Sequence, residues 1–274
     1  MVDGLRRLPA DARDRLTGRR RPPIPPTRLM FDGTRTVEAF VQDGEEYLRY
    51  YVELAGLRPD DRILDLGSGI GRKTVPLTGY LSASGSYEGL DIVERGVRWC
   101  RKHITSSHPN FRFQRADVYN ELYNPRGRVA PAEYRFPFAD AEFDVVMLSS
   151  VFTHMLPGDV RHYLGEIARV LRPGGRAMVS WFLIDDESRG LIEAGRSTIP
   201  FAPGADCWIG NPDVAEGAVA YEERDVLAMC GSQGLELRTP IHYGSWCGRD
   251  EHLSYQDLVI TVRTTDRQAL ESSR

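Results

Sequence analysis

Three aspartates that end apolar segments are the residues of this chain best suited to bind a polar ligand: Asp65, Asp91 and Asp117. Successive members are 26 residues apart, a spacing that suits a repeating β-α unit. A carboxylate accepts several hydrogen bonds, so it can bind ribose hydroxyls or a ligand's ammonium group. Because the carboxyl ends of parallel strands meet at one edge of a sheet, the spacing predicts a ligand held across three strand tips.

A glycine-rich turn follows the first of these aspartates. An apolar strand is expected over 63–66, and glycines then occupy alternating positions, at Gly67, Gly69 and Gly71. Glycine permits a sharp turn and a close approach of a ligand to the backbone. The helix expected beyond the turn begins with free N–H groups. A strand, a glycine turn and a helix in this order are typical of a nucleotide-binding edge in an α/β sheet.

The spacing of the glycines argues against a dinucleotide. That fingerprint is G-x-G-x-x-G, but here Arg72 occupies the position of the third glycine. A pyrophosphate in the turn would also be repelled by Asp65, whereas an ammonium group or ribose hydroxyls would be attracted. The pattern therefore favours S-adenosylmethionine (SAM) over NAD as the cofactor.

The stretch from Ile63 to Arg72 resembles motif I of the class I SAM-dependent methyltransferases. The run 167–175, Ile-Ala-Arg-Val-Leu-Arg-Pro-Gly-Gly, is similar to the family's connection into its fifth strand. The resemblance covers about residues 37–263. It implies an α/β, Rossmann-like fold, a seven-stranded and mostly parallel sheet with helices on both faces. The implied strand order is 3-2-1-4-5-7-6, with strand seven antiparallel.

The resemblance also implies roles in binding the methyl donor. Asp65 would help to hold the methionine ammonium group, Asp91 the ribose and Asp117 the adenine amino group, with the backbone N–H of Val118 beside it. The complete set of expected cofactor-binding residues is Asp65, Gly67, Ser68, Gly69, Gly71, Asp91, Ile92, Asp117, Val118 and Ser149.

His154 is the candidate catalytic residue. It follows the expected fourth strand, 143–150, in a segment that faces the methyl group in the family. An imidazole with a pKa near neutrality can take a proton from a hydroxyl or an amine. The alternative is a packed or capping histidine. A carboxylate within 185–187 is a second candidate base, although these acids are expected to form a solvated turn.

Apolar periodicity predicts the elements that position these residues. Helices are expected over 37–55, 72–80, 93–103, 159–171 and 221–232. The remaining strands are expected over 86–91, 111–117, 176–184, 235–239 and 258–262.

One methyltransferase domain is expected over 29–263. An arginine- and proline-rich tail, 1–28, precedes it, and a frayed tail, 264–274, follows. Within the domain, a tyrosine-bearing insertion near 118–135 is expected to be a lid or a substrate wall, with a decorative surface loop as the alternative. A second, glycine- and proline-rich segment near 200–220 is expected to be an irregular loop.

The composition limits the partners. A net charge of −4 and a pI of about 5.9 give no basic face for nucleic acid. No apolar run approaches the ~18 residues of a membrane span, and no secretory signal is visible. Four cysteines without a C-x-x-C pair suggest reduced thiols in a cytoplasmic protein. Six histidines without an H-x-x-x-H pair suggest no metal site, and the oligomeric state is not indicated.

The expected function is SAM-dependent transfer of a methyl group to a small-molecule acceptor. Because His154 suits an oxygen nucleophile, a hydroxyl of a sugar or secondary metabolite is favoured. Two alternatives remain open: an NAD(P)-dependent Rossmann oxidoreductase, and a non-catalytic SAM-binding module.

Overall fold

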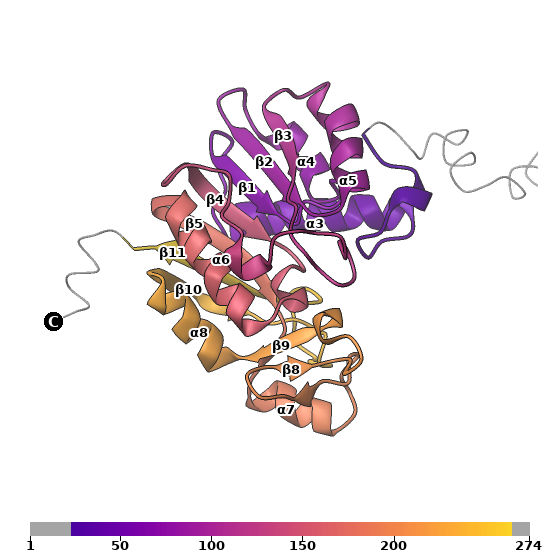
Figure 1. Ribbon diagram of the computed structural model, residues 1–274, viewed down its shortest axis with the longest axis vertical. Helices are drawn as coiled ribbons and strands as arrows, with labels where there is room; N and C mark the ends of the chain where they lie inside the picture. The colour runs from indigo at the N-terminus through magenta and orange to yellow at the C-terminus, as the bar shows by residue number, and fades with distance from the viewer. Residues whose placement is uncertain (1–22, 265–274) are drawn as a thin grey trace, which may run out of the picture. The chain divides into compact units, whose positions relative to one another are not determined.

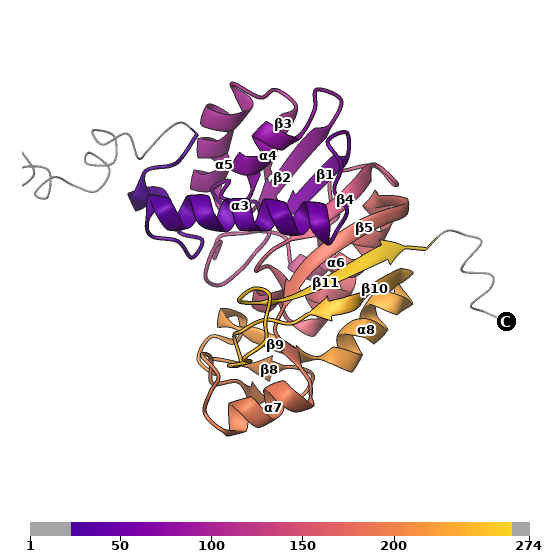
Figure 2. The ribbon, with the colours of Figure 1, turned by 180° about the vertical axis from the view of Figure 1, so that it is seen from behind.

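The computed structural model describes residues 23–264. The expected tail 1–28 lies mostly outside this range, and the tail 264–274 almost wholly so. Seven strands form one hydrogen-bonded sheet in the order β10-β11-β5-β4-β1-β2-β3 (Figures 1 and 2). Strand β11 is antiparallel to β5 and β10, whereas β1 and β4, β4 and β5, and β2 and β3 pair in parallel. The implied α/β, Rossmann-like fold is therefore confirmed, including its strand order.

Contacts divide the chain into two compact units, which are described separately. Of the described residues, unit 1 comprises 23–61 and 68–116, and unit 2 comprises 62–67 and 117–264. The described elements of unit 1 are η1 (Thr27–Leu29), α3 (Val37–Glu53), α4 (Thr74–Tyr80), β2 (Ser86–Asp91), α5 (Glu94–Cys100), the π-helical turn η2 (Arg101–Thr105) and β3 (Phe111–Arg115).

Helix α3 shows how the sequence of unit 1 specifies its elements. Thr36 caps the helix, because its hydroxyl accepts the backbone N–H of Ala39 at 3.1 Å. Phe40, Tyr47 and Tyr51 lie on the buried face, as their helical spacing predicts.

Unit 2 carries the other five strands of the large sheet. These are β1 (Arg62–Leu66), β4 (Phe143–Leu148), β5 (Leu171–Trp181), β10 (Leu235–His242) and β11 (Asp257–Arg263). Strand β4 is buried at almost every position, as expected for a strand covered on both faces. Helix α6 (Pro157–Val170) leads directly into β5, which begins at Leu171 and not at Arg176. Pro173, Gly174 and Gly175, which were expected to connect the helix to the strand, therefore lie within the first half of β5.

A second, smaller sheet in unit 2 corrects the expected irregular loop near 200–220. Its order is β6-β9-β8-β7, with β6 (Leu183–Ile184), β7 (Ala202–Pro203), β8 (Trp208–Ile209) and β9 (Val219–Glu222). Three of these strands have only two residues, too short for an alternating pattern to be recognised. Strand β9 also takes the first residues of the helix expected over 221–232, so α8 spans Glu223–Ser232.

The small sheet packs on a cluster of buried aromatic residues. Phe182, Phe201 and Trp246 lie with ring centroids 5.3 Å apart in each pair. Asp257 ties this cluster to the large sheet. Its carboxylate accepts the backbone N–H groups of Leu183 and Gly244 and the indole N–H of Trp246, each at 2.7 Å.

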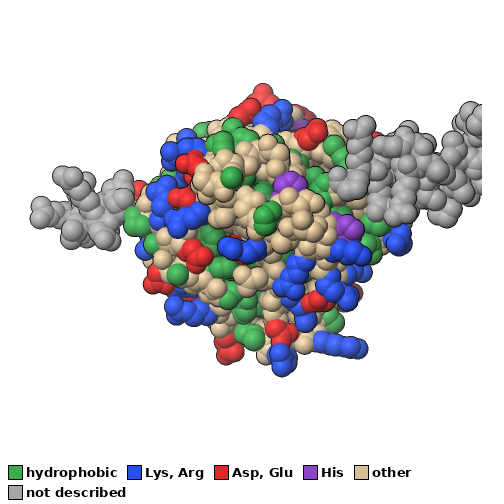
Figure 3. Space-filling view, turned by 90° about the horizontal axis from the view of Figure 1, so that it is seen from above, with side chains coloured by type: hydrophobic (Ala, Val, Ile, Leu, Met, Phe, Trp, Pro, Cys, Tyr) green, Lys and Arg blue, Asp and Glu red, His purple; other side chains and the backbone are tan. Residues whose placement is uncertain are grey.

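The described surface mixes charges of both signs. On the face shown in Figure 3, Lys and Arg side chains are interspersed with Asp and Glu side chains. Within residues 23–264, no helix has both the length and the apolar character that a membrane span requires.

Candidate active site

The glycine turn adopts a backbone that other residues rarely take. Gly67, Gly69 and Gly71 have φ angles of 84°, 57° and 82°, all in the left-handed region that favours glycine. The backbone N–H of Gly71 donates to the carbonyl of Ser68 at 3.0 Å and closes the turn. The side-chain hydroxyl of Ser68 is buried without a hydrogen-bond partner among the described residues.

Within unit 1, the turn is fixed to the tip of β2 through Asp91. One carboxylate oxygen accepts the backbone N–H of Gly69 at 2.7 Å, and the other accepts that of Val93 at 2.6 Å. Two backbone donors thus hold the carboxylate of Asp91 in one orientation. Ile92 follows Asp91 in the chain and is half-buried.

Within unit 2, Asp65 and Ser149 lie at the carboxyl ends of two neighbouring parallel strands. Asp65 lies near the end of β1 and is only 4% exposed, and Ser149 follows β4 directly. Gly67, on the same unit, faces Val151: a Cβ at this glycine would lie 2.4 Å from the Cγ2 atom of Val151. The backbone therefore approaches this segment more closely than any side chain would allow.

Asp117 has a partner that the sequence did not reveal. Its carboxylate lies 2.5 Å from Nε of Arg128, which is 86% exposed. An exposed pair of this kind contributes little to stability, so a ligand donor can displace Arg128. Val118 is buried and bridges to Val129 across the insertion.

His154 lies in the short helix η4 (Phe152–His154) of unit 2. Its Nδ1 atom is 2.9 Å from the backbone carbonyl oxygen of Glu216. Because a carbonyl only accepts, Nδ1 carries the proton and the lone pair of the neutral ring is on Nε2. Burial lowers the pKa of His154 and outweighs the carbonyls of Glu216 and Gly217, which favour protonation. The ring is therefore neutral near pH 7.

The acids at 185–187 begin a helix, where a turn was expected. Asp185 caps helix α7 (Asp186–Glu193) through the backbone N–H of Ser188 at 2.8 Å. It also accepts from the buried guanidinium of Arg249 at 2.6 Å, and Glu187 pairs with the same group. Burial opposes ionisation, but the hydrogen bonds from Arg249 and Ser188 keep the pKa of Asp185 below its usual value.

The sequence did not predict a polar cluster that lies beside the glycine turn of unit 1. Its members are Arg72, Asp43, Asp32 and Thr34. Nε of Arg72 lies 3.2 Å from a carboxylate oxygen of Asp43 and 3.7 Å from one of Asp32. A Cβ on Gly69 would lie 2.8 Å from Asp32. Buried oxygens of Asp32 and Thr34 have no hydrogen-bond partner among residues 23–264. The only sequence signal was Arg72, at the place of the missing third glycine.

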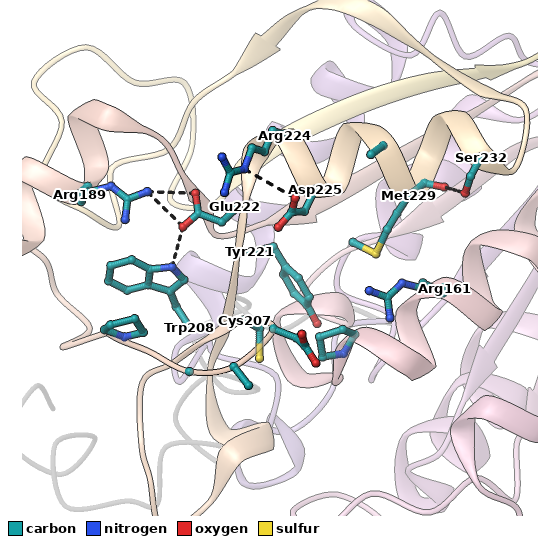
Figure 4. A pocket seen from close by; sticks show the side chains of 16 residues that line it. Arg161, Arg189, Cys207, Trp208, Tyr221, Glu222, Arg224, Asp225, Met229 and Ser232 are labelled. Atoms are coloured by element: carbon teal, nitrogen blue, oxygen red, sulfur yellow. Dashed lines mark hydrogen bonds and ion pairs between the residues drawn. The ribbon is translucent and has the colours of Figure 1, made fainter.

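Unit 2 also has a pocket of about 630 Å³ between the small sheet, the start of α6 and one side of α8 (Figure 4). One wall is a fixed network, in which Glu222 accepts from Arg189 at 3.0 Å and from the indole of Trp208 at 2.9 Å. The hydroxyl of Tyr221 donates to the carbonyl of Met155, the residue after His154. Of the described residues, no three His, Cys, Asp or Glu side chains are grouped to hold a metal ion.

Comparison with known proteins assigns the central part of the chain. A family model described as a methyltransferase domain matches residues 64–179, from the strand before the glycine turn to strand β5. The 27-O-demethylrifamycin SV methyltransferase of Amycolatopsis mediterranei is 30% identical over 135 residues, 49% of this chain and 43% of that protein. The phthiotriol/phenolphthiotriol dimycocerosates methyltransferase 1 of Mycobacterium ulcerans is 32% identical over 147 residues, 51% and 45% of the two chains. The matches thus span less than half the length of these two relatives.

Solved structures agree on the fold. The PH0226 protein of Pyrococcus horikoshii superposes with a TM-score of 0.56 at 16% identity, covering 85% of this chain and 93% of that one. The magnesium protoporphyrin IX methyltransferase of Synechocystis, solved with bound S-adenosylhomocysteine, gives 0.53 at 17% identity, covering 86% and 92%. Residues 64–179 thus match a methyltransferase domain, within a sheet whose strand order is the one that the resemblance to class I, SAM-dependent methyltransferases implies.

Proposed function

We propose that this protein transfers a methyl group from SAM to a small-molecule acceptor, at a hydroxyl oxygen. The observation that supports it most is the turn described above, where the methyltransferase-domain match coincides with three glycines at positive φ and with Asp91 bonded to Gly69. When bound, SAM supplies an electrophilic methyl group on a sulfonium centre.

The residues of the chain fit that donor. We propose that it is held by Asp65, Gly67, Ser68, Gly69, Gly71, Asp91, Ile92, Asp117, Val118 and Ser149. The glycines leave the backbone open to a close approach, and the unpartnered hydroxyl of Ser68 is a free hydrogen-bonding group in the turn. Asp91 is ordered by two backbone donors, and its carboxylate is the proposed acceptor for the ribose hydroxyls.

His154 supports an oxygen acceptor. A neutral hydroxyl must lose its proton as its oxygen bonds to the methyl carbon, and the proton needs an acceptor. The Nε2 lone pair of His154 is available because Nδ1–H is bonded to the carbonyl of Glu216. In this mechanism His154 takes the proton, and the rest of the site aligns the oxygen with the methyl carbon.

The names of the matched relatives support a small acceptor. The pocket of Figure 4 does not bear on this point, because neither His154 nor any residue proposed to hold the donor lines it. The relatives described above are named for methylation of rifamycin-type and phthiotriol-type compounds, which are small molecules.

The proposal is tested with methyl-labelled SAM and a small-molecule extract of the source cells. Labelled products are identified by mass spectrometry, with His154→Gln and Asp91→Ala as parallel samples. We expect a labelled O-methyl product with the wild-type protein and little with either variant. A labelled product of equal yield with His154→Gln would remove the histidine from the mechanism. No labelled product, combined with tight S-adenosylhomocysteine binding, would indicate a non-catalytic binding module.

A further inference from the structure

Glu216 connects two parts of unit 2 that are distant in sequence. It lies in the short helix η5 (Ala215–Gly217). One of its carboxylate oxygens accepts the side-chain N–H of Asn120 at 2.9 Å and the backbone N–H of Glu121 at 3.1 Å. The insertion near 118–135 is thus fastened to η5 by a single carboxylate oxygen.

The fastened part of the insertion is a compact loop, residues 118–124. Asn120 and Asn124 exchange backbone hydrogen bonds at 3.2 and 3.0 Å. The side-chain oxygen of Asn120 accepts the backbone N–H groups of Leu122 and Tyr123, and the amide of Asn124 donates to the carbonyl of Val118 at 2.8 Å. Because the loop orders itself internally, the contact with Glu216 determines where it lies and not whether it is folded.

The same glutamate holds the candidate base. Its backbone carbonyl accepts Nδ1–H of His154 at 2.9 Å. From the loop, Tyr123 presents its ring edge-on to the imidazole, with centroids 5.6 Å apart and planes at 78°. The imidazole of His154 therefore has the carbonyl of Glu216 on one nitrogen and a loop positioned by the carboxylate of Glu216 beside its ring.

We propose that Glu216 is a positioning residue, which keeps loop 118–124 beside the imidazole of His154 and fixes the tautomer that leaves Nε2 free to accept a proton. The inference rests on the proposed role of His154 as the base. It adds a residue that touches neither acceptor nor donor and acts through the orientation and solvation of the histidine.

The contact between loop 118–124 and Glu216 depends on whether the Glu216 carboxyl group is ionised, and nearby charged groups affect that ionisation. Burial, and then the carboxylates of Asp159 and Glu121, raise the pKa of Glu216. The donors from Asn120 and Glu121 oppose them by stabilising the charged form. Protonation in acid would weaken both hydrogen bonds to the loop, because a neutral carboxyl oxygen is a poorer acceptor.

The test uses the full-length protein and needs no acceptor. Nitrogen NMR of labelled histidine reports the tautomer and the pKa of His154, assigned through His154→Gln, and trypsin reports opening of the insertion at Arg126 and Arg128. Glu216→Ala removes the accepting oxygen, Glu216→Gln retains an oxygen that can accept both donors, and Glu121→Gln is the matched control because its backbone N–H is unchanged.

In Glu216→Ala we expect the Nδ1–H tautomer to persist, because the backbone carbonyl that accepts it remains. We expect a His154 pKa raised toward its ordinary value as the ring becomes solvated, and cleavage faster by about 10-fold. Glu216→Gln should restore most of the wild-type behaviour, and Glu121→Gln should match the wild type. An unchanged His154 pKa and cleavage rate in a folded Glu216→Ala protein would overturn the proposal, as would failure of Glu216→Gln to rescue. Full methyl transfer by His154→Gln would instead refute the role of the base and leave these NMR results intact.

Discussion

Oδ2 of Asp91 lies 2.7 Å from the backbone nitrogen of Gly69, so the glycine turn and the tip of β2 fix each other. The bond orients the carboxylate before any ligand arrives, which reduces the ordering cost of binding. It also explains why an acid of strand two and a glycine 22 positions earlier belong to one site.

Replacing Asp91 by Asn should weaken donor binding. The amide places an N–H group against one of the two backbone donors and offers fewer lone pairs to the ribose. We expect the dissociation constant of S-adenosylhomocysteine, measured by calorimetry, to rise by about 10- to 100-fold. Asp60→Asn, at an exposed position of the same unit, is the control and should bind as the wild type does. Equal affinity of the two variants would contradict the role of Asp91.

Gly67→Ala should destabilise the fold. At a φ of 84° the backbone of an alanine is strained, and its Cβ would lie 2.4 Å from the Cγ2 atom of Val151. We expect a loss of about 2–5 kcal/mol in the free energy of unfolding by urea. Gly79→Ala is the matched comparison, because helix α4 has open space there, and alanine should stabilise it by up to about 1 kcal/mol. A Gly67→Ala protein as stable as the wild type would show that the turn has been placed wrongly.

The pH dependence of methyl transfer should follow His154. Burial lowers its pKa below the ordinary 6.5, so the neutral base should accumulate as pH rises, and the acid limb of the rate should lie at lower pH than for an ordinary imidazole. In His154→Gln we expect kcat to fall by about 100- to 10,000-fold and this acid limb to disappear. A rate that keeps its acid limb in the variant would assign the titration to another group.

The lowered pKa of His154 should also make the free energy of unfolding depend on pH. Between its folded-state pKa and 6.5, the unfolded chain binds more protons at this residue than the folded protein does. Its effect is therefore to lower stability as pH falls through that window. Urea unfolding of the wild type and His154→Gln at a series of pH values would isolate this component, since all other groups are shared.

Asp257 should show the opposite dependence. Burial raises its pKa to about 7, against the hydrogen bonds from Leu183, Gly244 and Trp246. The folded protein then binds more protons at this residue than the unfolded chain between pH 3.8 and about 7. Its contribution to stability should fall as pH rises through that range.

Asp257→Asn should remove this pH dependence and cost about 2–3 kcal/mol, because one of three backbone and indole donors loses its acceptor. Trp246 fluorescence and urea unfolding at pH 5 and pH 8 measure both effects. An equal pH dependence in the variant would show that Asp257 does not titrate in this range.

The parts of the fold with long, regular patterns could be predicted from the sequence. The amphipathic face of α3 and the buried run of β4 have a periodicity that one sequence shows clearly. The small sheet could not be predicted, because Ala202–Pro203 and Trp208–Ile209 are strands only through their pairing partners. Helix α7 was hidden by its acidic first turn, where Asp185 is a cap and not a solvated residue.

The sequence predicted that Asp91 and Gly69 lie close together, because the strand ends and the glycines follow a regular spacing. Asp91 and Gly69 were expected from strand ends and glycine positions, and the structure joins them. The partners of His154 were not, because Glu216 lies 62 residues away and contacts it through a backbone carbonyl. No side-chain pattern encodes an acceptor of that kind, so only the folded chain reveals it.

The most direct test of the account is calorimetric titration of the purified protein with S-adenosylhomocysteine and, separately, with NADH. The account predicts saturable binding of one S-adenosylhomocysteine per chain, and no heat of binding with NADH. Saturable NADH binding without any response to S-adenosylhomocysteine or SAM would contradict it.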